Sequence, residues 1–405
     1  MTQKGLTGFF EKFIDEKNIF LNKKALQASY TPDTILHREK QIDLIANILA
    51  PVLRNEKPSN LFIFGKTGTG KTLSIKYVSK KLAEVAAKHE VPLTTKYLNC
   101  KLKKIADTEY RLVAQLIREL GKSVPPTGLP TDEVYNIFLD IIDAEPMNLI
   151  IILDEIDQLV NKTGDEIIYN LTRINSELKN SQITFVGISN SLVFTENMDP
   201  RAKSSLGQEE VIFPPYNAIE IQDILRNRAK KAYLPEVLQD GVIEKCAAYA
   251  AREHGDARRA LDLLRVSGEL AERQGAKQVT LEHLDEAEEK IEKDRVVEIV
   301  KTQPKQSQAT LYCVLCLLEK TKNKEQVYTG DVYNLYKEIC PKTDLRPLTQ
   351  RRISDIIAEL DMLGIINTHV ISKGRYGRTK EISMEIPSYL QERIDTILKL
   401  ELGLK

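Results

Sequence analysis

The residues best suited to chemistry form one stretch, Gly65-Lys-Thr-Gly-Thr-Gly-Lys-Thr72, which matches the pattern G-x-x-x-x-G-K-[ST] at every fixed position. Consecutive backbone N–H groups can wrap a triphosphate when the chain curls tightly, and the three glycines allow such a curl. Lys71 would then reach the β- and γ-phosphates, and the Thr72 hydroxyl would ligate Mg²⁺. The pattern therefore predicts a nucleotide site lined by Gly65, Lys66, Thr67, Gly68, Thr69, Gly70, Lys71, Thr72 and Leu73.

A pair of acidic residues, Asp154 and Glu155, follows a second apolar run at 149–153. At the tip of a strand beside a phosphate loop, Asp154 would hold Mg²⁺ directly or through water, and Glu155 would polarise the attacking water. The alternative is that the pair only caps the next helix. Asn190 follows another apolar run and would orient the water near the γ-phosphate, although an Asn in this position is more often a turn residue.

These side chains require a sheet and helices to position them. Short apolar strands are predicted at 61–64, 94–98, 149–153, 183–189 and 211–213, and helical periodicity lies between them. Strands that alternate with helices predict an α/β domain with a parallel sheet. Every segment from 219 to about 295 has helical spacing, so a small helical domain is expected to follow.

The C-terminal part has a different pattern. Helices are predicted at 309–320, 329–339 and 349–363, followed by two strands that flank a basic turn. Three helices and a hairpin predict a winged-helix domain. Residues 346–380 carry seven Lys/Arg and three Asp/Glu, a local net charge of +4. The residues expected to contact DNA are Thr349, Gln350, Arg351, Arg352 and Ser354 on the third helix and Lys373, Arg375, Tyr376 and Arg378 on the wing. The alternative is a winged helix that contacts proteins.

Composition limits the other function classes. The 405 residues are enough for two to three domains, and Lys+Arg and Asp+Glu both number 58, so any basic surface must be local. Cys313 and Cys316 form a CxxC, but they lie in an apolar run without a second pair at zinc spacing, which favours core packing over metal or redox chemistry. The sequence has no apolar span of 18 residues, and its N-terminus lacks the apolar core of a signal peptide. We therefore expect a soluble protein in the cytoplasm, associated with the nucleoid and not with a membrane.

Several motifs together resemble the AAA+ ATPases. With the C-terminal winged helix, the chain is similar to the archaeal origin-recognition initiators, which are related to the large subunit of the eukaryotic origin-recognition complex and to its helicase-loading partner. The resemblance covers roughly Tyr30 to the end. The segments that carry it, besides the phosphate loop, are Leu36-His-Arg-Glu39, Leu153-Asp-Glu-Ile-Asp157, Phe213-Pro-Pro-Tyr216 and Gly255-Asp-Ala-Arg-Arg259.

The resemblance implies roles for further residues. Asn190 would be sensor 1, and Arg258 would be sensor 2, reaching the γ-phosphate from a helical lid. Tyr216 and Arg228 would line the nucleotide, and Arg201 is the candidate arginine finger for the nucleotide of a neighbouring subunit. The domains implied are an AAA+ core at 1–217 with an initiator-specific insertion at about 101–130, a helical lid at 218–298, a linker at 299–308 and a winged-helix domain at 309–405.

The resemblance also implies a function. Proteins of this type bind ATP/ADP with Mg²⁺, bind and deform double-stranded origin DNA, recruit the replicative helicase and can act with paralogous initiator subunits. Slow ATP hydrolysis would serve as a switch. The sequence also allows two alternative functions. One is an AAA+ loader whose winged helix docks proteins, and the other is an ATP-gated transcription regulator.

Overall fold

The computed structural model describes residues 19–101, 108–125, 128–164, 166–191, 208–252, 255–321, 326–372, 378–384, 386 and 388–404. The chain divides into two compact units, Met1–Leu284 and Asp285–Lys405, and each is described by itself. The boundary falls inside one helix, α12 (Leu281–Thr302), rather than at the expected end of the lid at 298. Among the residues described, no helix is both long enough and apolar enough to cross a membrane.

Parallel strands form the sheet of the first unit, in the order β2-β3-β4-β1-β5. They are β1 (Asn60–Phe64), β2 (Leu93–Asn99), β3 (Asn148–Asp154), β4 (Gln182–Ser189) and β5 (Gln208–Ile212). The last residue of β3, Asp154, pairs with Ile188, and the last residue of β1, Phe64, pairs with Ser189. The phosphate loop, the Asp154-Glu155 pair and Asn190 therefore all leave the sheet at one edge. The predicted α/β fold with a parallel sheet is confirmed.

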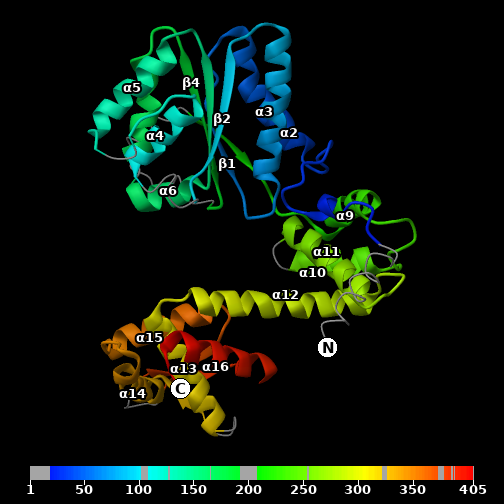
Figure 1. Cartoon of the computed structure of the whole chain (residues 1–405), viewed down its shortest axis with the longest axis vertical. Coiled ribbons are helices and arrows are strands. Elements are labelled where there is room, and N and C mark those ends of the chain that lie inside the picture. The colour runs from blue at the N-terminus through cyan, green and yellow to red at the C-terminus, as the bar shows by residue number, and fades with distance from the viewer. Residues whose placement is uncertain are drawn as a thin grey trace, which may run out of the picture. The chain divides into compact units, whose positions relative to one another are not determined.

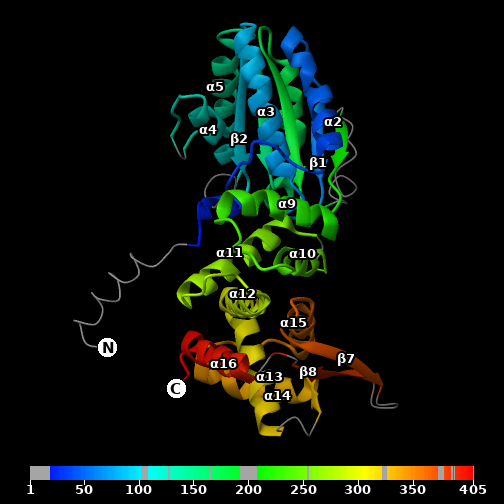
Figure 2. The same ribbon diagram turned by 90° about the vertical axis from the view of Figure 1, so that its right-hand side faces the viewer.

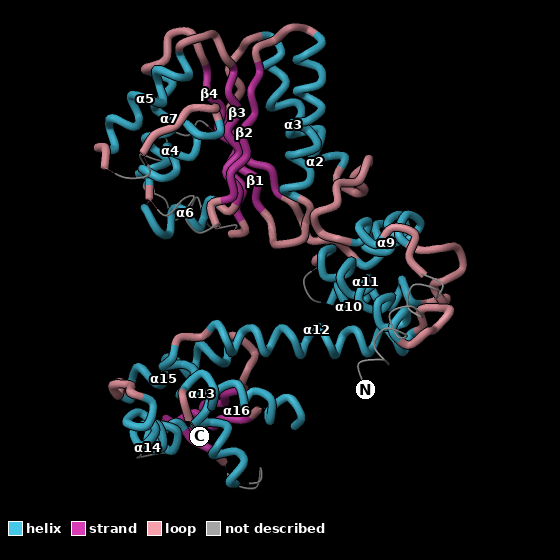
Figure 3. The backbone as a smooth tube through the Cα atoms, in the orientation of Figure 1, coloured by secondary structure: helices cyan, strands magenta, loops and turns pink. Residues whose placement is uncertain are grey.

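Alternating strand residues supply two apolar layers because successive side chains point to opposite faces of a sheet. Phe62 and Phe64 belong to one layer, and Leu61 and Ile63 belong to the other. Helices α4 (Glu109–Glu119), α5 (Thr131–Asp143), α6 (Ile156–Thr163) and α7 (Glu166–Arg173) complete the first layer, while α2 (Glu39–Leu49) and α3 (Lys71–Lys88) complete the second. Figures 1 and 3 show the strands between these two groups of helices.

The lid consists of α9 (Ala218–Ala232), α10 (Val242–Arg252), α11 (Ala257–Arg273) and the beginning of α12, and Figure 2 shows the first three packed together. Helix α9 begins at a capping box in which the Asn217 side chain accepts the Glu220 N–H and the Glu220 carboxylate accepts the Asn217 N–H. Such a box satisfies N–H groups that a helix start would otherwise leave unpaired. It fixes the point at which the chain enters the lid.

The segment 19–36, here called the strap, packs on the lid although the sequence placed it with the core. Phe20 stacks on Tyr233 with ring centroids 4.8 Å apart, and the Leu21 N–H donates to the Ala232 carbonyl at 2.8 Å. The short 3-10 helix η1 (Lys23–Leu26) contacts α9 and α11. Apolar contacts with the lid helices thus determine the position of the strap, although the strap is next to the core in the sequence.

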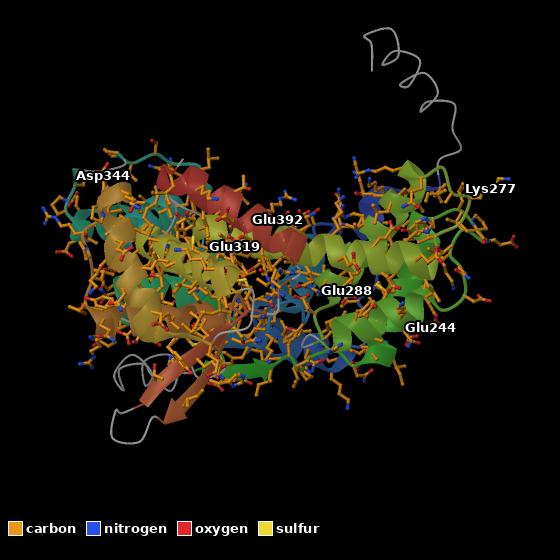
Figure 4. All side chains as sticks on the ribbon, turned by 90° about the horizontal axis from the view of Figure 1, so that it is seen from below. Glu244, Lys277, Glu288, Glu319, Asp344 and Glu392 are labelled. Atoms are coloured by element: carbon orange, nitrogen blue, oxygen red, sulfur yellow. The ribbon has the colours of Figure 1, made fainter. Side chains whose placement is uncertain are left out.

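The second unit contains α13 (Lys305–Thr321), α14 (Thr329–Ile339), α15 (Gln350–Met362) and α16 (Ser388–Leu402) with a small antiparallel sheet. Its strands are β6 (Val327–Tyr328), β7 (Asn367–Ser372) and β8 (Arg378–Ser383), in the order β6-β8-β7. The predicted winged helix is confirmed, and β6 and α16 are additions that the sequence reading did not anticipate. Exposed charges such as Glu319 and Glu392 cover the outside of its helices (Figure 4).

The expected linker at 299–308 differs in the structure. Helix α12 continues to Thr302 and α13 begins at Lys305, so that only Gln303 and Pro304 lie outside a helix. The polar composition of this stretch concealed its packing, because Val300 and Gln308 are buried and the Gln308 amide donates to the Val300 carbonyl at 3.1 Å. Cys313 of the CxxC motif is buried, in agreement with the prediction that this motif packs in the core.

Candidate nucleotide site and the winged helix

The phosphate loop joins β1 to α3 and packs directly on the lid. Gly68 has a left-handed φ of 71°, and a Cβ there would lie 1.7 Å from Oδ1 of Asp256, the N-cap residue of α11. A Cβ on Gly65 would lie 2.5 Å from the Phe213 carbonyl oxygen. Both glycines are therefore needed for close backbone approach as well as for curling the loop. The Ala257 N–H also donates to the Gly68 carbonyl at 3.4 Å, so the lid and the loop are in contact.

Lys71 is the first residue of α3, and its side chain contacts the loop. It is only 6 % exposed, and its Nζ donates to the carbonyls of Gly65 and Lys66 at 2.7 Å each. The same Nζ donates to Oδ1 of Asn190 at 3.0 Å. Burial lowers the pKa of Lys71 to about 8, although the nearby Asp154 carboxylate favours the charged form. The cation that would face the phosphates is thus fixed by the loop and linked to the predicted sensor residue.

Thr72 and Asp154 lie side by side, as a shared Mg²⁺ site requires. The Thr72 hydroxyl donates to Oδ2 of Asp154 at 2.8 Å, and Asp154 is buried. One carboxylate and one hydroxyl, completed by phosphate oxygens and water, form a donor set that Mg²⁺ accepts. Among the residues described, no cluster of three or more His, Cys, Asp and Glu forms an alternative metal site. The residues present therefore fit the magnesium ion that the fold implies.

Tyr97 is a neighbour of this site that the sequence reading missed. Its hydroxyl donates to Oδ2 of Asp154 at 2.7 Å, so this oxygen accepts from both Tyr97 and Thr72. Tyr97 pairs with Ile152 in the register of β2 and β3, which places it on the same face as Asp154, two residues further along β3. Tyr97 can be assigned to the site only when β2 is known to lie beside β3, and the sequence does not give the order of the strands.

Glu155 follows in a left-handed conformation with a φ of 56°, immediately before α6. Its N–H donates to Oδ1 of Asp154 at 3.0 Å. Its own carboxylate makes no capping hydrogen bond to α6 and lies 3.7 Å from Nζ of Lys101. The carboxylate is therefore not used as a helix cap, and it is placed at the same sheet edge as Lys71 and Asn190. Its predicted role towards water remains a prediction.

The strap, the loop and the lid together line one pocket. The strap contributes residues 28–32 and 34–36, the loop end contributes Gly68, Gly70, Thr72 and Leu73, and the lid contributes Arg228 and Arg258. Tyr216, at the start of the lid, also lines the pocket and is buried. The Arg228 guanidinium donates to the carbonyls of Ala25 and Tyr30 at 3.2 Å each, so it also anchors the strap. The structure thus places predicted residues of the loop and of the lid around one pocket.

Arg38 is a second residue that the sequence reading left without a role. It is 2 % exposed and directly precedes α2. Its side chain donates to the carbonyls of Thr69, His37 and Pro214 at 2.9, 2.8 and 2.6 Å. The guanidinium carbon lies 3.6 Å from the ring centroid of Tyr216. A single arginine therefore contacts the phosphate loop and the entrance to the lid.

The predicted DNA-facing residues lie in the second unit. Helix α15 begins after Thr349, whose hydroxyl accepts the Arg352 N–H at 3.4 Å. Gln350, Arg351 and Arg352 are exposed, and Ser354 is half-buried. Arg352 pairs with Glu359 at 3.2 Å, whereas Arg351 makes no ion pair with any residue that the structure describes. The predicted wing residues Lys373, Arg375 and Tyr376, and the predicted arginine finger Arg201, lie outside the described residues, and Arg378 is described only as the first backbone position of β8.

Fold and site define the class, a AAA+ ATPase with a helical lid and a C-terminal winged-helix domain. Three family models match the chain: "AAA domain" at 54–193, "Cdc6 AAA+ ATPase-type lid domain" at 222–289 and "CDC6, C terminal winged helix domain" at 298–390. ORC1-type DNA replication protein 1 of Methanosarcina acetivorans is 54% identical over 384 residues, which cover 95% of this chain and 92% of that protein.

Two further comparisons agree. The ORC1-type DNA replication protein of Pyrococcus furiosus is 52% identical over 404 residues, with 99% of this chain and 94% of that protein covered. The solved structure of the Aeropyrum pernix ORC1 protein in complex with DNA matches with a TM-score of 0.82 and 43% identity, covering 95% of this chain and 98% of that one. The chain belongs to the family of ORC1-type DNA replication proteins, and the predicted family is confirmed.

Proposed function

We propose that this chain is an ATP-dependent replication initiator that binds double-stranded origin DNA through its winged helix. It deforms the DNA and helps to recruit the replicative helicase, with ATP/ADP and Mg²⁺ at the nucleotide site and slow hydrolysis as a switch. The observation that carries the proposal is the pocket itself, because its walls come from the loop, the strap and the lid. A ligand held by several elements can bias their arrangement, which is what a switch requires.

Each site residue has a role in this proposal. Lys71 binds the β- and γ-phosphates, and Thr72 and Asp154 hold Mg²⁺, which when bound neutralises phosphate charge. Glu155 and Asn190 orient the attacking water, and Arg258 reaches the γ-phosphate from the lid. Arg201 would act on the nucleotide of a neighbouring, paralogous or identical, subunit. The distances from Lys71 to Asn190 and from Thr72 to Asp154 support this grouping.

The DNA contacts are assigned to the first turn of α15 and to the wing. Arg351 supports this assignment because it is exposed and, among the described residues, has no acidic partner that would occupy it. An arginine at the N-terminal end of a recognition helix can contact phosphates or the edge of a guanine. The local net charge of +4 over 346–380, within a chain of net charge zero, supports the same surface.

The test is footprinting on genomic duplex fragments with ATP and with ADP, comparing the wild type with Arg351→Ala. The matched control is Arg393→Ala, an exposed arginine on α16 of the same unit. We expect protection of repeated sites beside an A·T-rich region, with affinity lowered about tenfold or more by Arg351→Ala and unchanged by the control. Enhanced cleavage inside the protected sites would report the deformation.

Two results would contradict the proposal. Uniform binding that depends only on salt and is equally affected by both variants would indicate nonspecific phosphate contact, and would favour a loader whose winged helix docks proteins. Protection at promoters without origin repeats would favour a transcription regulator. Helicase recruitment has its own readout, the capture of purified replicative helicase on origin fragments that carry the bound chain.

A further inference from the structure

Arg38 is a buried arginine whose charge is balanced without a carboxylate partner among the described residues. Its guanidinium makes no ion pair with a carboxylate among the described residues, and its hydrogen bonds go to main-chain carbonyl oxygens. A buried charge is costly unless its donors are satisfied, and an arginine with several donors in a fixed plane can serve several acceptors at once. The Tyr216 ring, 3.6 Å from the guanidinium carbon, provides a further favourable contact.

The acceptors belong to three different parts of the first unit. The strap packs on the lid, so the chain passes from the lid side to the core at 36–39 and returns to the lid at 213–217. We call these two segments the crossings. His37 belongs to the first crossing, and its ring pairs with Asp223 of α9 at 3.1 Å. Pro214 belongs to the second crossing, and Thr69 belongs to the phosphate loop. Arg38 thus connects both crossings to the loop.

The loop carbonyl is the informative contact. When backbone N–H groups of a phosphate loop turn towards the ligand, the carbonyls of the same peptides turn away from it. The Thr69 carbonyl accepts from Nε of Arg38 at 2.9 Å on that outer side, and the Thr69 side chain is buried. Arg38 therefore favours the loop conformation in which the following N–H group, that of Gly70, is available to a phosphate.

We propose that Arg38 is the positioning residue that transmits nucleotide occupancy of the phosphate loop to the core–lid crossings. The inference rests on the proposed nucleotide switch and names the side chain through which it acts. Nucleotide orders the loop, the ordered loop presents the Thr69 carbonyl, and Arg38 held by that carbonyl fixes His37 and Pro214. Because coupling between two sites is reciprocal, fixing the two crossings also strengthens nucleotide binding.

The test is hydrogen exchange of the full chain with and without saturating ADP, followed by peptides that contain the loop and the two crossings. In the wild type we expect ADP to slow exchange in all three, with a common midpoint in ADP concentration. In Arg38→Gln we expect ADP affinity lower by about tenfold or more, from loss of hydrogen bonds to a charged group. At saturating ADP its loop is still protected, but the crossings are not.

Two further variants make the result interpretable. Arg38→Lys keeps the charge but cannot reach three carbonyls in one plane, so it should also lose protection of the crossings, and it serves if Arg38→Gln does not fold. Arg226→Lys is the matched control, because Arg226 is an exposed arginine of α9 that pairs with Asp223 and Glu244 and does not contact the loop. It should behave as the wild type.

The outcomes separate the inference from the proposed function. If ADP protects the crossings equally in the wild type and in both Arg38 variants, Arg38 does not transmit occupancy, and the switch itself stands. If ADP protects the loop but not the crossings of the wild type, the proposed switch fails, and the inference fails with it. If Arg38→Gln does not fold, Arg38→Lys decides between these outcomes by the same comparison with the wild type.

Discussion

At the scale of single residues, the site is defined by polar atoms that bind more than one partner. Oδ2 of Asp154 accepts from both Thr72 and Tyr97, and the carbonyl oxygens of Gly65 and Lys66 share one donor, Nζ of Lys71. A carboxylate held by two hydroxyl groups has a fixed orientation before any ligand arrives. The cost of binding is therefore reduced, because less side-chain freedom is lost when nucleotide and Mg²⁺ enter.

Tyr97→Phe should weaken Mg²⁺-dependent nucleotide binding without unfolding the chain. The change removes one hydrogen bond to the Asp154 carboxylate, and bonds to charged groups contribute about 1.5–3 kcal/mol. We expect ATP affinity with Mg²⁺ to fall by about tenfold or more, and affinity in EDTA to change much less. Titration of a fluorescent ATP analogue under both conditions measures this.

The matched control is Tyr110→Phe, which removes a hydroxyl that donates to the Pro125 carbonyl at 2.7 Å on an exposed part of the core. Equal losses of affinity with and without Mg²⁺ in Tyr97→Phe would show that Tyr97 supports the loop as a whole rather than the orientation of Asp154.

Much of the site could be predicted at this scale, and its limits have a physical cause. The phosphate-loop spacing identified Lys71 and Thr72, since a fixed pattern of glycines and Lys-Thr has one geometry. Tyr97 belongs to no local pattern, and Arg38 lies in the segment Leu36-His-Arg-Glu39, which indicates the family but gives Arg38 no role. Their partners lie 57 and 176 residues away, at Asp154 and Pro214. Only the strand order and the path of the crossings bring them to the site.

At the scale of elements, the strap and α11 depend on one close contact. Gly268 lies on α11, and a Cβ there would meet the Tyr233 hydroxyl at 2.3 Å and the Phe20 ring at 2.5 Å. The helix approaches the Phe20–Tyr233 stack so closely that only a hydrogen atom fits. Local propensity alone would favour alanine over glycine at this position.

Gly268→Ala should therefore destabilise the first unit although alanine is the better helix former. We expect a loss of about 1–3 kcal/mol from overpacking, partly offset by a helix-propensity gain of about 1 kcal/mol. The matched control is Gly330→Ala on α14, where a Cβ would meet nothing within 4 Å, and it should be neutral or stabilising. Chemical denaturation of both variants measures the free energies of unfolding. A stabilised Gly268→Ala would show that the stack can move away.

Predictions of helices and strands from the sequence were accurate for the buried strands and the recognition helix, and they failed for the strap and the expected linker. Buried strands such as β3 were recognised because residues 149–153 are all apolar, and the predicted third helix of the winged domain corresponds to α15. The packing of the strap on the lid and the helices within the expected linker were not predicted, because the linker is short of apolar residues and the apolar residues of the strap follow no clear period. Their few buried side chains, such as Phe20 and Val300, pack against elements that the local pattern does not reveal.

At the scale of the whole molecule, the two compact units should unfold as separate transitions. Phe20→Ala removes a buried ring from the first unit and should cost it about 3–5 kcal/mol. We expect calorimetry to show a lower melting temperature for one transition only. Tyr336→Ala, which removes a fully buried ring from the second unit, is the reciprocal variant and should lower the other transition. A single transition shifted equally by both would show that the units unfold together.

The strap has a consequence for the order of synthesis. Ala25 and its partner Arg228 are 203 residues apart in the chain, and the whole α/β core is made between them. At about 5–20 residues per second, the strap emerges from a ribosome roughly 10–40 seconds before the helix that covers it. During that interval Phe20 and Leu26 have no partner surface from the lid. The lid is therefore a domain in two pieces with the core inserted between them, and it can close only after the core has been translated.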